Sequence, residues 1–173
     1  MANTYFKIGS VTASGGETTL TLDSLSGSYT DLIIWWNGRD TRSNANFNNI
    51  LLKVNDATTN YSERIFYGLG SGSTPTGASG SNPGINYLYT DTNQLGSNWF
   101  GATCIYISNY STSSAKYFYC WSNTAGNSGT QINAMTTARW NSSSAITKVT
   151  INIDGAYTFV AGSEAQVYGI KNS

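Results

Sequence analysis

The sequence contains no histidine, few charged residues and only two cysteines. Histidine is the side chain whose ordinary pKa lies closest to neutral pH, so its absence excludes Ser-His-Asp and Cys-His catalytic sites. Two cysteines without histidine also cannot provide the four ligands of a common zinc site. Charged residues make up 10% of the 173 residues, and their formal net charge is zero. The composition therefore argues against an enzyme and predicts no metal ion or other cofactor.

The chain also lacks a basic cluster and a long apolar run. Nucleic-acid binding draws much of its affinity from basic side chains on phosphates, so we expect neither DNA nor RNA as a partner. A membrane-spanning helix needs about 20 apolar residues, and no segment approaches that length. The start of the chain, Met1 to Lys7, runs at once into polar and aromatic residues and does not have the pattern of a secretory signal. We therefore expect a soluble protein that is made in a cytoplasm.

Small polar residues dominate what is present: Ser, Thr, Asn and Gly account for 82 of the 173 residues. They favour turns and exposed strand positions, whereas the β-branched and aromatic residues between them favour strands. About ten segments alternate apolar and polar residues with a period of two, and no segment of ten residues combines helical spacing with a cap. The pattern predicts one all-β domain over residues 1–173, an antiparallel β-sandwich with little helix and, in particular, a jelly roll.

Three local predictions follow from this pattern. The continuous apolar run at residues 32–36 is typical of a central strand covered on both faces. Residues 68–84 hold six glycines and both prolines, which predicts a long exposed loop. Strand segments on either side of short polar turns predict two hairpins, one pairing residues 5–11 with 18–22 and one pairing residues 50–55 with 61–67.

The state of the two cysteines depends on the pairing of their strands. If Ile105 shares the inner face with Phe118 and Cys120, which is the cleaner apolar pattern, Cys104 lies opposite Trp121 and points outward. The two sulfurs then cannot meet. A slip of one residue places the cysteines opposite each other, where a strained cross-strand disulfide is conceivable. We expect reduced cysteines because of both the pattern and the compartment.

Four residues are candidates for contact with a partner protein or a glycan. Trp99 and Trp140 lie beside polar, loop-like neighbours, so we expect them to be the most exposed tryptophans. Arg39 and Arg42 follow the apolar run at 32–36 and serve a subunit contact as readily as a ligand. Twelve tyrosines and five tryptophans also suit sugar binding. We favour the alternative, in which they fill the core and subunit contacts.

A pair of carboxylates that converges in space is the remaining route to an enzyme, because two such groups can hydrolyse a glycan. Asp91 with Glu63 is an example of such a pair. Nothing in the sequence favours this arrangement over separate structural roles.

Two stretches resemble small β-sandwich structural proteins of tailed bacteriophages and prophages. One stretch is residues 29–39, Tyr-Thr-Asp-Leu-Ile-Ile-Trp-Trp-Asn-Gly-Arg, with residues 50–56 and 59–62 after it. The other is the close of the chain, residues 157–159, 161–163 and 167–171. From their first to their last residue, 29–62 and 157–171, the two stretches span 49 of the 173 residues. These motifs do not separate capsid decoration proteins from tail or fibre parts.

The resemblance implies a sandwich or jelly-roll fold, assembly into trimers or larger symmetric units, and a place on the virion surface. It carries over no catalytic residue. Our first expectation is a capsid decoration or cement protein that binds the major capsid protein or other virion proteins and stabilises the shell. The alternative is the receptor- or glycan-binding tip of a tail fibre. A glycan-degrading enzyme is a third hypothesis.

Overall fold

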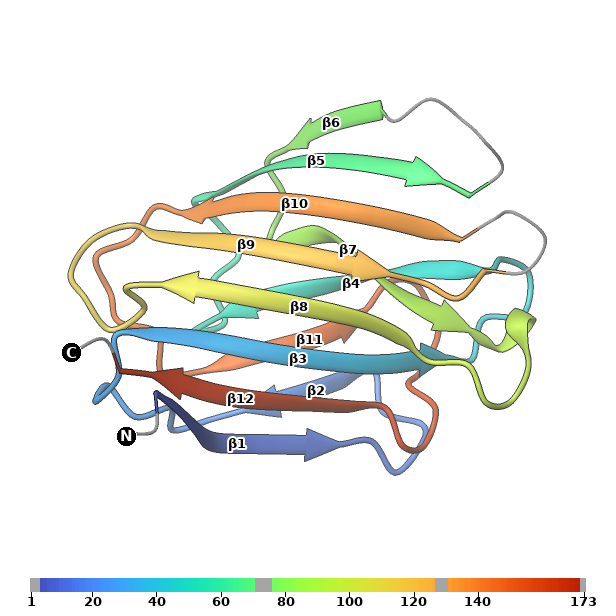
Figure 1. Ribbon diagram of the computed structural model, residues 1–173, viewed down its shortest axis with the longest axis horizontal. Helices are drawn as coiled ribbons and strands as arrows, with labels where there is room; N and C mark the ends of the chain where they lie inside the picture. Colours follow the sequence, from blue (N-terminus) through green and yellow to red (C-terminus); the bar gives the residue numbers. More distant parts are fainter. Residues whose placement is uncertain (1–3, 71–75, 127–130, 172–173) are drawn as a thin grey trace.

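The computed structural model describes residues 4–70, 76–126 and 131–171, and this part of the chain is all-β (Figure 1). It contains twelve strands and one 3-10 turn, η1, at Asn93–Leu95. The strands are β1 Tyr5–Thr12, β2 Thr19–Leu22, β3 Asp31–Asp40, β4 Phe47–Val54, β5 Tyr61–Leu69, β6 Thr76–Gly80, β7 Ile85–Thr92, β8 Gly101–Ser108, β9 Lys116–Asn123, β10 Ile132–Trp140, β11 Val149–Ile153 and β12 Glu164–Ile170. The predicted all-β class is confirmed.

The strands form two layers. Eight antiparallel strands lie in the order β1-β12-β3-β8-β9-β10-β5-β6, and four lie in the order β2-β11-β4-β7. A short parallel pairing of Arg39–Asp40 on β3 with Asp91–Thr92 on β7 joins them. In Figure 1 the four-stranded layer lies behind the eight-stranded one. The order characteristic of a jelly roll stays a prediction.

The core lies between the layers and is built by alternation along each strand. On β3, the side chains of Leu32, Ile34 and Trp36 are fully buried, and the Trp36 ring packs edge-on against Phe159 with 5.1 Å between centroids. β3 is central, since β12 and β8 flank it. The predicted coverage of both its faces is wrong, because Trp35 points away from the core and is 49% exposed.

Both predicted hairpins are wrong, although their strands form. β1 pairs with β12 whereas β2 pairs with β11, so the two strands belong to different layers. Likewise β4 pairs with β7 and β11, while β5 pairs with β10 and β6. The first turn is held by other contacts: Gly16 N–H donates to the carbonyl of Phe159 at 3.1 Å, and Gly15 N–H donates to the Glu17 carboxylate at 2.8 Å. Each turn therefore carries the chain from one layer to the other.

The predicted loop at residues 68–84 is only partly a loop. Within it, β6 adds an edge strand to β5, with Ala78 opposite Ile65. Residues 71–75 lie outside the described residues. The chain returning from β6 is held by the buried Glu63 side chain, which accepts hydrogen bonds from the Asn82 amide and from the backbone N–H groups of Asn86 (3.0 Å) and Tyr87 (3.2 Å).

Replacing Glu63 with Ala is expected to lower the free energy of unfolding by about 2 kcal/mol, because it leaves three half-buried donors without their acceptor. Hydrogen exchange at the amides of Asn86 and Tyr87 should accelerate more than exchange elsewhere. Glu63→Gln, which keeps an amide oxygen as acceptor, should retain part of the protection. Unchanged protection of both amides in Glu63→Ala would show that Glu63 does not hold this segment.

The predicted register of the cysteines is confirmed. Ile105 pairs with Cys120, and Cys104 pairs with Trp121. Both cysteines are free, with Cys120 buried and Cys104 half-buried on the opposite side of the sheet. Burial raises the pKa of the Cys104 thiol, so both the geometry and the protonation of these groups disfavour a disulfide.

Candidate binding face

Exposed apolar side chains gather on the side of the eight-stranded sheet that faces away from the core. Nine large hydrophobic residues of the described chain are exposed, and six of them point outward from β3, β9, β10 and β5. We call this surface the outer face and define it by the outward residues of five adjacent strands: Trp35, Cys104, Tyr106, Tyr117, Tyr119, Trp121, Met135, Thr137, Arg139, Ser62, Arg64 and Phe66.

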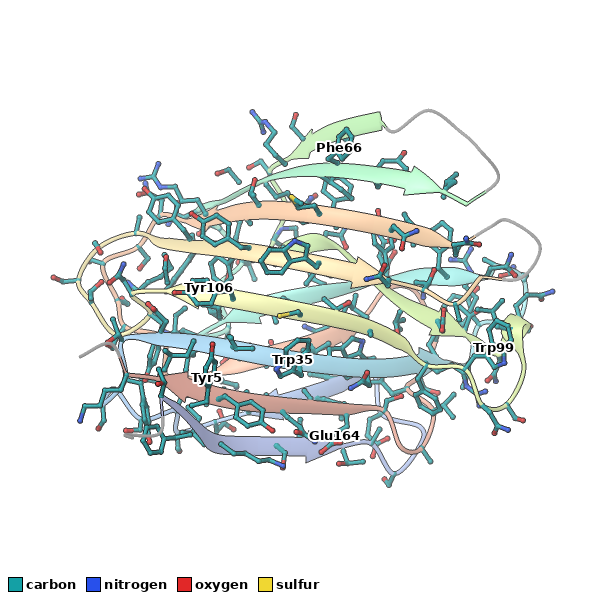
Figure 2. All side chains as sticks on the ribbon, in the orientation of Figure 1. Tyr5, Trp35, Phe66, Trp99, Tyr106 and Glu164 are labelled. Carbon is teal, nitrogen blue, oxygen red and sulfur yellow. The ribbon has the colours of Figure 1, made fainter. Side chains whose placement is uncertain are left out.

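An apolar row crosses the outer face at right angles to the strands. Trp35, Cys104, Trp121, Met135 and Phe66 are successive partners in the register of β3, β8, β9, β10 and β5. Neighbouring strands are about 4.8 Å apart, so the three rings follow one another at about 10 Å. Figure 2 shows Trp35 and Phe66 on the same face, toward opposite ends of this row. The sequence therefore places a row of large apolar side chains in solvent, with a hollow at the smaller Cys104 between Trp35 and Trp121.

A row of tyrosines runs beside the apolar row. Tyr106 lies opposite Tyr119, with 6.2 Å between ring centroids, and its hydroxyl donates to Asp31 Oδ2 at 2.6 Å. Burial and this hydrogen bond raise the pKa of Tyr106 to about 12. The row continues through Thr137 to Arg64. Tyr106 is thus fixed as a neutral hydrogen-bond donor at the border of the face.

A shallow depression of about 330 Å³ opens where β9, β10 and β5 meet. Thr137 is small and stands between Tyr119 and Arg64, while Arg139 lies opposite both Tyr117 and Ser62. The depression exists because larger side chains surround this threonine. Its lining includes two tyrosines, two arginines and Glu63, whose side chain is buried. The exposed arginines make this an arrangement able to hold an anion.

The two arginines of the depression bond to neutral oxygens. Arg64 Nη1 donates to the Glu63 carbonyl at 3.1 Å, and Arg139 Nη2 donates to Asn141 Oδ1 at 2.6 Å. Across residues 4–70, 76–126 and 131–171, neither guanidinium pairs with a carboxylate. The outer face therefore carries two positive charges, on Arg64 and Arg139, that no carboxylate of the described residues neutralises.

Of the two tryptophans predicted to be exposed, only one is. Trp99 is 43% exposed and lies between η1 and β8, at the side of the molecule in Figure 2. Trp140 is 5% exposed and stacks on Tyr61 with 6.3 Å between centroids. Its predicted exposure is wrong because the alternation of β10 continues to its last residue and turns that residue inward.

The two predicted arginines hold the fold together near β3. Arg39 is buried, donates to the carbonyl of Gly96 and lies over the Phe100 ring, so the predicted surface contact is not available to it. Arg42 is half-buried; it donates to Asn44 at 3.0 Å and to Asn48 at 3.2 Å. A partner contact through Arg42 or Trp99 stays a prediction.

Glu63 and Asp91, the example of a carboxylate pair, have separate partners. Glu63 binds the segment after β6, as described above. Asp91 Oδ1 accepts from the Ala125 N–H at 2.9 Å, and its buried Oδ2 has no hydrogen-bond partner. Burial raises the pKa of Asp91 to about 6, against the opposing effect of Arg39. Among the described residues, no three His, Cys, Asp or Glu side chains cluster as metal ligands.

The raised pKa of Asp91 predicts that the stability of the fold depends on pH. Its native pKa of about 6 lies above the ordinary value of about 3.9. Between these values the native state keeps a proton that the unfolded state has lost, so stability falls as pH rises through this window, by about 3 kcal/mol in total. Asp91→Asn should remove that fall, as urea unfolding at pH 4 and pH 7 would show. Equal pH dependence in both proteins would contradict the assignment.

The residues of the outer face were not among the sequence-based candidates. One signal for them was available, because the predicted strand register already turned Trp121 away from the core with Cys104. The alternation in β9, where Tyr117, Tyr119 and Trp121 occupy one side and Phe118 and Cys120 the other, gives two apolar sides. Only one of them can be covered by the four-stranded layer.

Comparison with known protein families, with curated proteins and with solved structures finds no match for this chain. In the ranges that the structure describes, no helix has the length and apolarity needed to cross a membrane.

Proposed function

We propose that this chain is a non-enzymatic structural protein of bacteriophage particles, a capsid decoration or cement protein that binds neighbouring capsid subunits through the outer face. The observation that carries the proposal is the row of Trp35, Trp121, Met135 and Phe66 in solvent. Exposed apolar patches of this kind mark interaction sites on soluble proteins. The residue types also fit, since Trp, Tyr, Phe, Met and Arg are enriched in protein interfaces.

The size of the whole eight-stranded sheet, of which the outer face covers five strands, agrees with a stable contact. Eight strands at about 4.8 Å spacing and strands of about eight residues at about 3.3 Å rise give a sheet of about 35 by 25 Å. Its area, on the order of 900 Å², is close to the roughly 800 Å² that each partner contributes to a typical stable interface. The sheet is thus large enough to attach the protein without help from a second surface.

The mechanism of a cement protein is mass action. A protein that binds the assembled lattice and not its separate subunits stabilises the lattice by its own binding free energy. The resemblance to phage structural proteins supports a place in the virion and suggests a trimer on its surface. The residues that carry it are 29–39, 50–56 and 59–62 in one stretch and 157–159, 161–163 and 167–171 in the other. The major capsid protein is then the first partner to test.

A second function, the receptor- or glycan-binding tip of a tail fibre, is favoured by one observation. The rings of Trp35, Trp121 and Phe66 follow one another at about 10 Å, a spacing comparable to two sugar rings in an extended chain. Aromatic faces of this kind can stack on successive sugars. The glycan contact then lies on the outer face and does not involve the buried Trp140.

Copy number in purified particles separates the two functions. Quantitative mass spectrometry of gradient-purified phage should find this chain in numbers set by icosahedral symmetry, comparable to those of the major capsid protein. Mild heating should release it before the shell opens. A few copies per particle, recovered with isolated tails, would support the fibre tip, and absence from the particle would contradict both.

A further inference from the structure

We propose that the depression between Arg64 and Arg139 binds a carboxylate of an acidic segment of the partner protein, next to apolar residues that pack on the row of Trp121, Met135 and Phe66. This inference rests on the proposed function, because it takes the outer face as the attachment surface. It adds the chemistry of the partner: acidic side chains beside aliphatic or aromatic ones.

The positions of the arginines fit a single carboxylate or two neighbouring ones. Arg64 on β5 lies opposite Thr137 on β10. Arg139 lies two residues after Thr137 on β10, so it is on the same face of the sheet. Diagonal neighbours of this kind are about 7–8 Å apart, a gap that their long side chains can close. A guanidinium group presents paired N–H donors to the two oxygens of a carboxylate. Tyr117 and Tyr119 complete the walls with hydroxyl groups.

Charge complementarity requires an acidic partner. None of the exposed outward residues of β3, β8, β9, β10 and β5 is Asp or Glu. Glu164 on β12 is the acidic residue labelled in Figure 2, and β3, β8 and β9 separate its strand from β10. A second copy of this chain that presented the same face would bring two further arginines and no exposed acid. The occupant is therefore a different surface.

The apolar row favours a protein segment over an acidic glycan. Cys104 and Met135 alternate with the three aromatic rings along the row. Neither offers a ring for a sugar to stack on, whereas methionine adapts readily to apolar side chains of a partner. An apolar row with two arginines beside it fits a peptide segment in which acidic and apolar residues are neighbours.

Binding of the full-length chain to immobilised poly-L-glutamate at low salt tests the proposal, with polygalacturonate as the acidic glycan and dextran as the neutral control. We expect binding to poly-L-glutamate. The double variant Arg64→Gln/Arg139→Gln should lose at least ~10-fold in affinity, since each lost charged hydrogen bond accounts for about that factor. The matched control Lys53→Gln/Lys148→Gln removes the same charge from the four-stranded layer and should bind like the wild type.

The conservative variant Arg64→Lys/Arg139→Lys keeps the charge but lacks the paired donors, so it should also bind more weakly than the wild type. Equal losses in the arginine and lysine double-glutamine variants would overturn the proposal, as would tighter binding to polygalacturonate than to poly-L-glutamate. All variants should unfold at the same temperature, because the altered side chains are on the surface. A wild-type chain that does not bind poly-L-glutamate but associates normally with particles would refute this inference alone. A wild-type chain that binds poly-L-glutamate but does not associate with particles would refute the proposed function.

Discussion

Replacing both Trp35 and Trp121 with Ala is expected to weaken attachment to the partner by ~100-fold or more, because buried tryptophans at the centre of an interface each contribute about 2 kcal/mol or more. The two residues flank Cys104 in the apolar row, near the middle of the eight-stranded sheet. Their side chains are 49% and 44% exposed, so truncation removes little packing from the core. The measurement is sedimentation of the variant with particles that lack this protein.

Trp99→Ala is the matched control for this experiment. Trp99 is 43% exposed, which is close to the exposure of Trp121, but it lies in the segment between η1 and β8 and not on the outer face. We expect Trp99→Ala to attach like the wild type. If Trp35→Ala/Trp121→Ala attaches normally and Trp99→Ala does not attach, the binding site lies in the segment between η1 and β8. That result would agree with the sequence-based prediction of a contact through Trp99.

The largest effect on stability is expected at Trp36, the neighbour of Trp35 on the opposite face of β3. Trp36→Ala should lower the free energy of unfolding by about 3–5 kcal/mol, as truncation of a buried aromatic residue does. The Trp36 side chain is fully buried against Phe159. It is also tightly enclosed, since a Cβ atom added at Gly38 would lie 1.9 Å from the Trp36 ring. Urea unfolding monitored by circular dichroism provides the measurement.

Trp35→Ala serves as the control for Trp36→Ala. The two residues have the same chemistry and adjacent positions, and only their burial differs. Because Trp35 is exposed, we expect its truncation to change stability by less than about 1 kcal/mol. Equal destabilisation by the two substitutions would mean that the outer face is covered within the monomer, which would remove the basis for the binding proposal.

Alternation along single strands was predictable from the sequence, and the way in which strands pair was only partly so. The period of two identified β9 and β10 and placed Cys104 opposite Trp121. The turn at Gly15 and Gly16 signalled a reversal of the chain, but a reversal fits a hairpin and a crossing between layers equally well. Which of these forms depends on distant partners such as Phe159, and local residue preferences do not contain that information.

The structure also differs from the sequence-based predictions at β6 and at Trp140, and both differences depend on distant residues. β6 has the sequence Thr-Gly-Ala-Ser-Gly, which shows no apolar alternation, and its place on the sheet depends on backbone pairing with β5 and on the long-range contacts of Glu63. Trp140 is followed by polar residues, so the sequence suggested exposure. Its stacking on Tyr61 depends on the pairing of β10 with β5, which brings the two residues opposite each other.

The outer face itself was hidden by the rule that apolar residues indicate the core. Residues 32–36 are apolar without interruption, and this pattern predicted coverage from both sides. The four-stranded layer covers one side of the larger sheet, and Trp35 is left on the other. A strand that is apolar on both faces has the same sequence pattern whether one or both faces are covered. The exposed face could therefore be identified only from the structure.

A reconstruction of the phage particle that resolves this chain tests the central claim most directly. The account predicts that the outer face lies against a neighbouring virion protein, with Trp35 and Trp121 buried in the contact and acidic side chains of the neighbour beside Arg64 and Arg139. A map in which the outer face is open to solvent, with the four-stranded layer forming the attachment, would contradict it.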